Sequence, residues 1–382
     1  MTSTSDPVIS KNRCARVIAF YLPQYHPIPE NDAWWGKGFT EWTNVTKAKP
    51  LFRGHRQPIL PGELGFYDLR LKEVRTRQAQ LAKSAGIEGF CYWHYWFGNG
   101  KKILQRVTDE VIQSGEPDYP FCLAWANESW TGRWHGLDNK TLIEQTYPGR
   151  TDEELHFYSI LPALQDRRYI EIDGRKLFLI YRPELLPSVQ SFINHWNELA
   201  RKNGINQFYF VSANDAHGLN EIPELEGIIP RHIQSPIHKG QKLNIRNVSY
   251  LALKTLGFGS GIDSISARLS GRYPLRTSYS SFAKEWKKLP RDIKTIPCLI
   301  PNWDNTARSG RRGYVLQDSR PDLFSSMIDW ALDYVKDRPY EMRLIFLKSW
   351  NEWAEGNYIE PDSVFGSGYL DALQSRIFYA SN

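Results

Sequence analysis

The chain has 382 residues, of which 41% are hydrophobic and 14% aromatic, and its 48 basic residues nearly balance its 42 acidic ones. This length suits one large domain such as an α/β barrel, and the scattered charge gives no support to nucleic-acid binding. No run of about 20 apolar residues occurs, so no membrane span is predicted. Met1 to Asn12 lack the apolar segment of a signal peptide, which predicts a cytoplasmic protein.

Short β-type runs alternate with helical stretches, which is the pattern of a parallel α/β fold. The predicted strands are residues 16–21, 89–95, 121–126, 176–181, 207–212, 227–231, 296–300 and 343–348. The predicted helices are residues 71–84, 101–113, 189–202 and 322–335. Gly86, Gly115 and Gly204 follow the first three helices as stop signals.

Eight strands alternating with helices predict a (β/α)8 TIM barrel. We expect a single catalytic domain over residues 16–382, preceded by a flexible N-terminus at residues 1–15. Two long loops, about residues 27–67 and 238–284, are predicted to wall the active-site cleft, because loops of this length usually serve function.

Chemistry in such a barrel takes place at the carboxyl ends of the strands, here called the mouth. Six predicted strands run into polar and aromatic residues at that end, and aromatic faces suit sugar rings. Turn formation or core packing explains any one of these residues, but six strand ends together favour a binding site. The candidates for substrate contact are Tyr25, His26, Trp35, Trp93, His94, Trp96, Asn127, Glu128, Trp130, Asp215, Trp303, Asp304, Asn305, Trp350, Asn351 and Trp353.

Glu352 and Glu355 follow the last predicted strand and are flanked by Trp350 and Trp353. A carboxylate pair performs general acid and base chemistry when one group stays protonated and the other ionised. A separation of about 5 to 5.5 Å is typical of retaining glycosidases and about 6.5 to 9.5 Å of inverting ones, and the sequence leaves this open. Glu128 is a rival partner for Glu352 across the mouth, although a contact with a sugar hydroxyl is the preferred prediction for it.

Three of the four cysteines lie within apolar runs and are predicted to be buried thiols of a reducing compartment: Cys91, Cys122 and Cys298. His26, His94 and His217 follow strands but match no metal-ligand spacing. No metal and no cofactor are therefore predicted.

No phosphate-binding glycine loop follows a predicted strand, since Gly98-Asn99-Gly100 lacks a third glycine. This weakens the case for a nucleotide-sugar site. Arg311 and Arg312 remain candidates for binding a diphosphate, and Arg308 is expected to form a polar cluster with Asp304 and Asn305.

Five segments together closely resemble the WbsX-like family: residues 19–32 (AFYLPQYHPIPEND), 35–42 (WGKGFTEW), 125–130 (WANESW), 301–306 (PNWDNT) and 350–356 (WNEWAEG). That family is named as a glycosyltransferase group of bacterial surface-polysaccharide biosynthesis. It is also similar to glycoside hydrolase family 99, a (β/α)8 barrel family of retaining endo-α-mannosidases.

The resemblance implies separate roles for the two glutamates. Glu352 would deprotonate the 2-hydroxyl of the substrate, which attacks the anomeric carbon to give a 1,2-anhydro sugar. Glu355 would protonate the leaving oxygen and then activate water. No cofactor is needed.

We therefore expect a glycoside hydrolase whose partner is an oligo- or polysaccharide. A glycosyltransferase of surface-polysaccharide biosynthesis is the first alternative, and a non-catalytic carbohydrate-binding protein is the second. The sequence does not predict the sugar, the linkage or the oligomeric state.

Overall fold

The computed structural model describes residues 13–132, 141–216, 218–230, 274–289 and 291–379. At its centre lies a ring of parallel strands, in which neighbours along the chain are also neighbours in the sheet. The ring consists of β1 (Arg16–Tyr21), β2 (Ile87–Trp96), β4 (Phe121–Trp125), β8 (Arg175–Ile180), β9 (Phe208–Ser212), β10 (Gly227–Ile228), β12 (Cys298–Leu299) and β14 (Leu344–Leu347).

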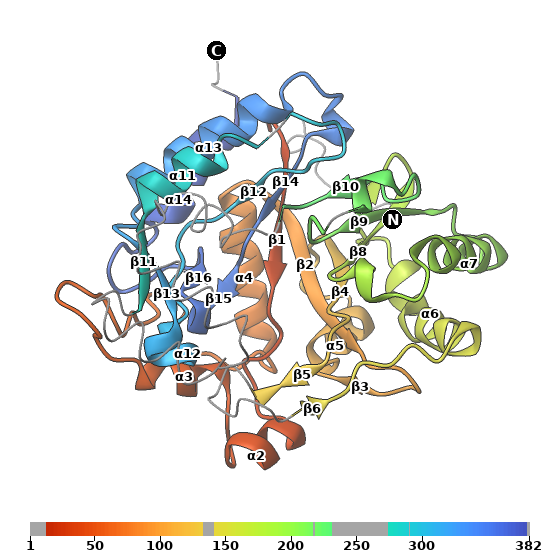
Figure 1. The fold of residues 1–382 in the computed structure, drawn as a ribbon, viewed down its shortest axis with the longest axis horizontal. Helices are drawn as coiled ribbons and strands as arrows, with labels where there is room; N and C mark the ends of the chain where they lie inside the picture. The colour runs from red at the N-terminus through yellow and green to blue at the C-terminus, as the bar shows by residue number, and fades with distance from the viewer. Residues whose placement is uncertain (1–12, 133–140, 217, 231–273, 290, 380–382) are drawn as a thin grey trace, which may run out of the picture.

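Two contacts close this ring. The last strand, β14, returns to pair in parallel with β1. Between β10 and β12, the Ile228 N–H donates to the Lys294 carbonyl and the Ile228 carbonyl accepts from the Ile296 N–H, both over 2.8 Å. The fold is therefore the predicted (β/α)8 TIM barrel (Figure 1).

Each predicted strand coincides with a barrel strand, and residues 16–21 match β1 at both ends. The apolar runs are a reliable signal here because strands of a parallel barrel are covered on both faces. Two strands are much shorter than predicted, with only two residues each. Residues 227–231 contribute only Gly227–Ile228, with residue 231 outside the described part, and residues 296–300 contribute only Cys298–Leu299.

Helices surround the barrel (Figure 1). They are α4 (Lys72–Ser84), α5 (Arg106–Ser114), α6 (Arg150–Leu164), α7 (Val189–Lys202), α11 (Tyr279–Trp286), α13 (Pro321–Val335) and α14 (Gly368–Ile377). The predicted helices correspond to α4, α5, α7 and α13, but α5 begins only at Arg106 because residues 102–103 of the predicted helix form a short strand. The sequence pattern does not predict α6, because Pro162 lies inside it and apolar residues such as Leu155 also occupy its exposed side.

The first long loop carries two short helices, α2 (Pro29–Trp35) and α3 (Glu41–Lys47). At the mouth, α3 contacts both α12 (Thr306–Ser309) and the 3-10 helix η6 (Trp353–Glu355), so three distant segments of the chain meet there. Figure 1 shows α3, α12 and β15 on the same side of the barrel. The second loop ends in α11, and its residues 238–273 lie outside the described part.

Short elements decorate the barrel ends. The strands are β3 (Lys102–Ile103), β5 (Trp130–Thr131), β6 (Thr141–Ile143), β7 (Glu171–Ile172), β11 (Leu275–Ser278), β13 (Tyr314–Gln317), β15 (Asn351–Glu352) and β16 (Asn357–Tyr358). The other 3-10 helices are η2 (Pro183–Leu185), η3 (Leu219–Glu221), η4 (Gly310–Arg312) and η5 (Tyr340–Met342).

The two ends of the described chain lie together, since Arg13 forms an antiparallel bridge with Phe378. Residues 1–12 of the predicted flexible N-terminus lie outside the described part. Across the described ranges, no helix combines the length and apolar character needed to cross a membrane. Cys91, Cys122 and Cys298 are buried free thiols, as predicted.

Trp196 on α7 anchors the layer between the helices and the barrel. Its side chain is fully buried, and its ring centroid lies 4.9 Å from that of Phe178 on β8 and 4.7 Å from that of Phe192. Removal of a large aromatic side chain from such a position would leave a cavity, because the surrounding barrel and helices cannot collapse to fill it. The side chain therefore contributes strongly to stability.

Replacing Trp196 with alanine should lower the free energy of unfolding by about 3 to 5 kcal/mol. Tyr158→Ala on α6 is the control, because that side chain is 50% exposed, and its loss should cost only about 0.5 kcal/mol. Urea denaturation followed by circular dichroism measures both. Equal losses in the two variants would contradict this packing.

Candidate active site

The chain leaves β14 through a short hairpin that carries both predicted catalytic residues. Glu352 lies on β15, which pairs with β16, and Glu355 ends η6. The turn between them requires glycine at position 356, because its φ is +54° and a Cβ there would lie 2.8 Å from the Asp304 backbone nitrogen. The glutamate-bearing loop is thus packed tightly against the segment that follows β12.

The guanidinium of Arg308, on α12, binds three carboxylates at the mouth. Its Nη2 lies 3.1 Å from a Glu352 oxygen, its Nη1 lies 2.9 Å from a Glu355 oxygen, and its Nε lies 3.0 Å from a Glu41 oxygen. The Arg308 side chain is only 12% exposed, and the Glu41 side chain only 2%. Glu352 and Glu355 therefore share one cation.

One guanidinium does not neutralise three carboxylates in a site with so little water. Burial, with smaller contributions from the nearby Glu355 and Glu41, raises the pKa of Glu352 to about 8 against the opposing effect of Arg308. Lys348, which follows β14, also lowers it. The pKa of Glu352 therefore lies well above that of an ordinary carboxylate.

Asp304 holds the loop that leads into α12. Its carboxylate accepts hydrogen bonds from His55 Nε2 over 2.7 Å, from Gln57 Nε2 over 2.8 Å and from the Thr306 N–H over 3.0 Å. Its own N–H donates to the Glu355 carbonyl over 2.8 Å. Asn305 also stabilises this loop, because its Oδ1 accepts a hydrogen bond from the Tyr314 N–H. Asp304 and Asn305, which the sequence predicts to contact substrate, instead use their polar atoms to hold the segments that carry Arg308 and Glu355.

Four more predicted residues lie inside the protein around the same hairpin. The Asn351 amide pairs with both backbone polar groups of Leu22, and Tyr25 donates its hydroxyl proton to the Asn351 carbonyl over 2.6 Å. The backbone N–H of Trp353 in turn donates to the Tyr25 hydroxyl. Trp350 is fully buried. These contacts tie the end of β14 to the end of β1.

Strand alternation divides the predicted residues of β2 into two sets. Trp93 stacks on Phe20 of β1 with ring centroids 4.9 Å apart and is partly exposed. His94 and Trp96 point the other way, towards α6, where His94 Nε2 lies 2.9 Å from His156 Nε2 and Trp96 Nε1 donates to Asp152. The structure thus brings Trp93, but neither His94 nor Trp96, towards the barrel axis.

The residues after β4 lie near a different cation. Asn127 binds the Arg182 backbone through both atoms of its amide, which ties β4 to β8. Glu128 forms an ion pair with the Arg182 side chain at 3.1 Å, so its carboxylate is not among those that bind Arg308. Trp130 is partly exposed and meets Tyr95 edge to face at 5.3 Å.

The remaining candidates are more scattered. His26 is 1% exposed, and burial lowers its pKa to about 4. Among the described residues, neither of its ring nitrogens has a hydrogen-bond partner. Trp35 lies half-buried on α2, and Asp215 is half-buried after β9. His217 lies outside the described residues.

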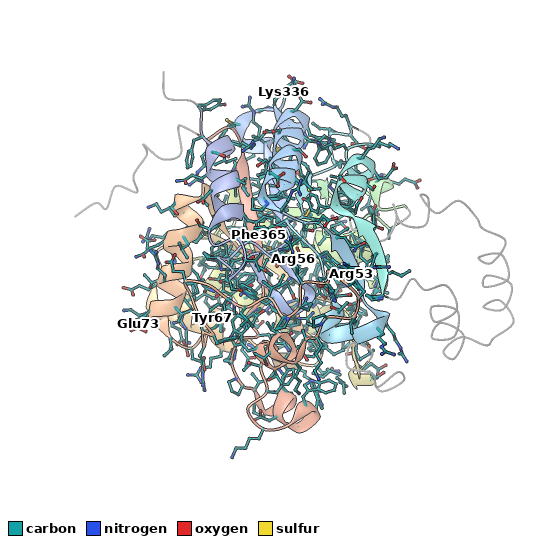
Figure 2. The ribbon with its side chains drawn as sticks, turned by 90° about the vertical axis from the view of Figure 1, so that its left-hand side faces the viewer. Arg53, Arg56, Tyr67, Glu73, Lys336 and Phe365 are labelled. Carbon is teal, nitrogen blue, oxygen red and sulfur yellow. The ribbon has the colours of Figure 1, made fainter. Side chains whose placement is uncertain are left out.

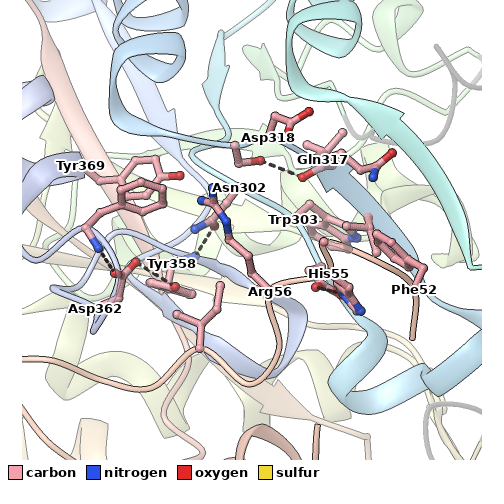
Figure 3. Close-up of a pocket in the computed structure, with 18 residues that line it drawn as sticks. Phe52, His55, Arg56, Asn302, Trp303, Gln317, Asp318, Tyr358, Asp362 and Tyr369 are labelled. Carbon is pink, nitrogen blue, oxygen red and sulfur yellow. Dashed lines mark hydrogen bonds and ion pairs between the residues drawn. The ribbon is translucent and has the colours of Figure 1, made fainter. Parts of the chain in front are cut away.

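Trp303 faces a hollow beside the glutamate-bearing loop (Figure 3). The hollow also touches Asn302, whose Oδ1 accepts from the Tyr358 N–H, and Tyr369. At its rim, the Arg56 guanidinium lies 5.5 Å from the centre of the Phe365 ring (Figure 2). Lys348 Nζ lies 5.3 Å from the centre of the Trp303 ring. This indole therefore joins the hollow to the mouth.

Two residues of the site escaped the sequence prediction. Glu41 binds Arg308 from α3, and Tyr95 lies close enough to Glu352 for that carboxylate to raise its pKa, after the larger effect of burial. Tyr95 follows Trp93 at the two-residue spacing of one strand face, which was the signal available for it. Within the described ranges, no group of three or more His, Cys, Asp or Glu side chains is arranged to hold a metal ion.

Comparison with known proteins agrees with the sequence motifs. Residues 17–373 match the family described as "Glycosyltransferase WbsX". The chain is 35% identical over 382 residues to the "Uncharacterized protein WxcX" of Xanthomonas campestris pv. campestris. The aligned region covers 95% of this chain and 50% of that relative. The chain thus spans about half the length of the curated relatives it matches.

Solved structures share the barrel. A "Glycoside hydrolase-like protein" superposes with a TM-score of 0.58 at 14% identity, over 97% of this chain and 95% of its own. The GH99 endo-alpha-mannosidase from Bacteroides thetaiotaomicron superposes with a TM-score of 0.55 at 15% identity, over 94% of this chain and 95% of its own. At such identities the likeness shows the fold. The family match covers nearly the whole chain, and this protein therefore belongs to the family described as "Glycosyltransferase WbsX".

Proposed function

We propose that this protein is a retaining α-glycoside hydrolase that acts on a bacterial surface polysaccharide or its precursor. The observation that carries the proposal is the convergence of Glu352 and Glu355 on the Arg308 guanidinium at the mouth of the barrel. Two buried carboxylates that face one point supply the acid and the base of glycoside cleavage. Partly exposed indoles nearby, Trp93 and Trp303, suit the apolar face of a sugar ring.

In the first proposed step, ionised Glu352 removes the proton of the substrate 2-hydroxyl. The resulting oxygen attacks the anomeric carbon while the bond to the leaving oxygen breaks, and Glu355 protonates that oxygen. This gives a 1,2-anhydro sugar. Water then attacks the anomeric carbon with Glu355 as base, and the proton on Glu352 returns to O2, so the configuration is retained.

Arg308 has two uses in this mechanism. It holds both carboxylates by separate nitrogen atoms, which fixes their positions before substrate arrives. Its charge also opposes the effect of burial on Glu352 and so increases the ionised fraction of the base. A base whose pKa lies near 8 is stronger than an ordinary carboxylate, which suits proton removal from a sugar hydroxyl.

Transfer to a second sugar is the alternative, and the family description favours it. Arg311 and Arg312 on η4, directly after α12, are the residues to test for binding of a diphosphate leaving group. Calorimetric titration with a panel of nucleoside diphosphates separates the two functions. Micromolar affinity would favour the transferase.

Glu352→Gln and Glu355→Gln should each lower kcat by about 100- to 10,000-fold, because each removes one proton-transfer group. The assay is reducing-end release from a panel of α-linked oligosaccharides. Glu128→Gln is the matched control, because Glu128 pairs with Arg182 at the same mouth. This variant should retain activity within tenfold, since a partly exposed ion pair typically contributes about 1 kcal/mol. Unchanged turnover in both catalytic variants, with normal melting temperatures, would refute the assignment.

The pH dependence of kcat/KM should report the ionisation of Glu352. Burial raises its folded-state pKa to about 8, so the base form that the mechanism needs accumulates as pH rises through about 8, and kcat/KM should increase there. Initial rates measured from about pH 6 to about pH 10, roughly two units on either side of the pKa of Glu352, test this. A fall through the same region would mean that Glu352 is the acid and that the two roles are exchanged.

Arg308→Gln should move that rising limb to higher pH. The arginine lowers the pKa of Glu352, so its removal leaves the effect of burial less opposed. The same initial-rate series measures the midpoint, and Arg182→Gln serves as the control because that arginine binds Glu128 instead. A midpoint that stays in place or moves to lower pH would contradict the proposed electrostatics.

A further inference from the structure

A third buried carboxyl group lies directly behind the glutamate-bearing loop. Glu360, just after β16, is 1% exposed. Its Oε2 accepts from Trp353 Nε1 over 2.6 Å and from the Tyr67 hydroxyl over 2.8 Å, and its Oε1 accepts from Gln78 Nε2 over 2.6 Å. None of these partners is positively charged. Burying a carboxylate without a cation is costly, so a group kept here needs a reason beyond packing.

The three partners come from different parts of the fold. Gln78 lies on α4 and accepts from the hydroxyl of Tyr21 at the end of β1. Tyr67 lies in the first long loop, where its carbonyl accepts from the indole of Trp42 on α3. Trp353 belongs to η6. Glu360 is thus a common acceptor for the barrel wall and for the loop that carries the catalytic pair.

Of the three partners, Trp353 connects Glu360 to the proposed catalytic pair, because it lies between Glu352 and Glu355 in the sequence. Its ring stacks on Tyr358 with centroids 3.7 Å apart and an interplanar angle of 13°. It also lies 5.7 Å from the ring of Trp42, the residue after Glu41. A rotation of this one indole would therefore disturb the segments that carry all three carboxylates bound by Arg308.

We propose that Glu360 is a positioning residue, which fixes the Trp353 indole and thereby holds Glu352 and Glu355 where both reach Arg308. The inference rests on the proposed function, since it takes these two glutamates as the reacting pair. Glu360 itself does not touch substrate. Burial raises its pKa to about 7, while the hydrogen bonds from Trp353, Gln78 and Tyr67 act in the opposite direction.

The chain supplies a matched control for a merely structural role. Asp152 on α6 is 9% exposed and also accepts an indole N–H, from Trp96 Nε1 over 3.0 Å. Its other oxygen accepts from the Asn99 N–H. This carboxyl group lies on the outer side of β2 and has no contact with the Arg308 cluster. Asp152→Asn therefore imitates the loss of a buried indole acceptor without affecting the catalytic pair.

The test uses Glu360→Gln, Trp353→Phe and the double variant in the full chain. In Glu360→Gln one acceptor oxygen becomes an NH2 donor that faces other donors, and Trp353→Phe keeps an aromatic ring but removes the N–H. Each single variant should lower kcat by about 100-fold, the cost of a misplaced catalytic group, with KM within threefold. The double variant should be no slower than the slower single variant, because both remove the same contact.

A second readout needs no substrate. Carbon-13 NMR of glutamate-labelled protein follows the titration of Glu352, assigned by its loss in Glu352→Gln. Both single variants should raise the midpoint of that titration, because Glu352 moves away from the Arg308 charge, whereas Asp152→Asn should leave it in place. If wild-type protein hydrolyses no α-linked oligosaccharide, the proposed function fails while this titration still tests the positioning role.

Three results would overturn the inference. The first is a normal Glu352 titration and normal kcat in Trp353→Phe, which is the milder variant and the one to use if Glu360→Gln does not fold. The second is multiplication of the two single effects in the double variant. The third is an equal effect of Asp152→Asn on kcat and on the titration.

Discussion

The site depends on the binding of three buried carboxylates by one guanidinium. Glu41 comes from the loop after β1, Arg308 from the helix after β12, and Glu352 and Glu355 from the hairpin after β14. The barrel makes this meeting possible because the carboxyl ends of all its strands open at one mouth. Burial, with the neighbouring Glu355 and Glu41, raises the pKa of Glu352 to about 8 against the opposing charge of Arg308.

Most polar side chains around this cluster serve to hold it. Asp304 collects donors from the first long loop and from its own turn, and Asn351 binds the backbone at the end of β1. Glu360 does the same for the indole of Trp353. Within the described part of the chain, these side chains are therefore occupied by contacts inside the protein. Recognition of the substrate is therefore expected to rest on the partly exposed indoles, chiefly Trp93 and Trp303.

The sequence predicts the barrel well because each strand is a continuous apolar run, and it predicts Glu352 and Glu355 because they follow such a run. It does not predict the ion pair between Glu41 and Arg308, since 267 residues separate them and only the closed ring brings them together. It also does not say which face of β2 a residue occupies. His94 therefore looked like a residue of the mouth, although its ring contacts α6.

The stereochemistry of cleavage tests the central claim most directly. Proton NMR of a reaction with an α-linked oligosaccharide distinguishes the anomers of the first-formed product before they interconvert. Two inversions, the first by the 2-hydroxyl under Glu352 and the second by water under Glu355, predict that the α-anomer appears first. Initial release of the β-anomer would contradict the account, because it would mean a single direct attack by water.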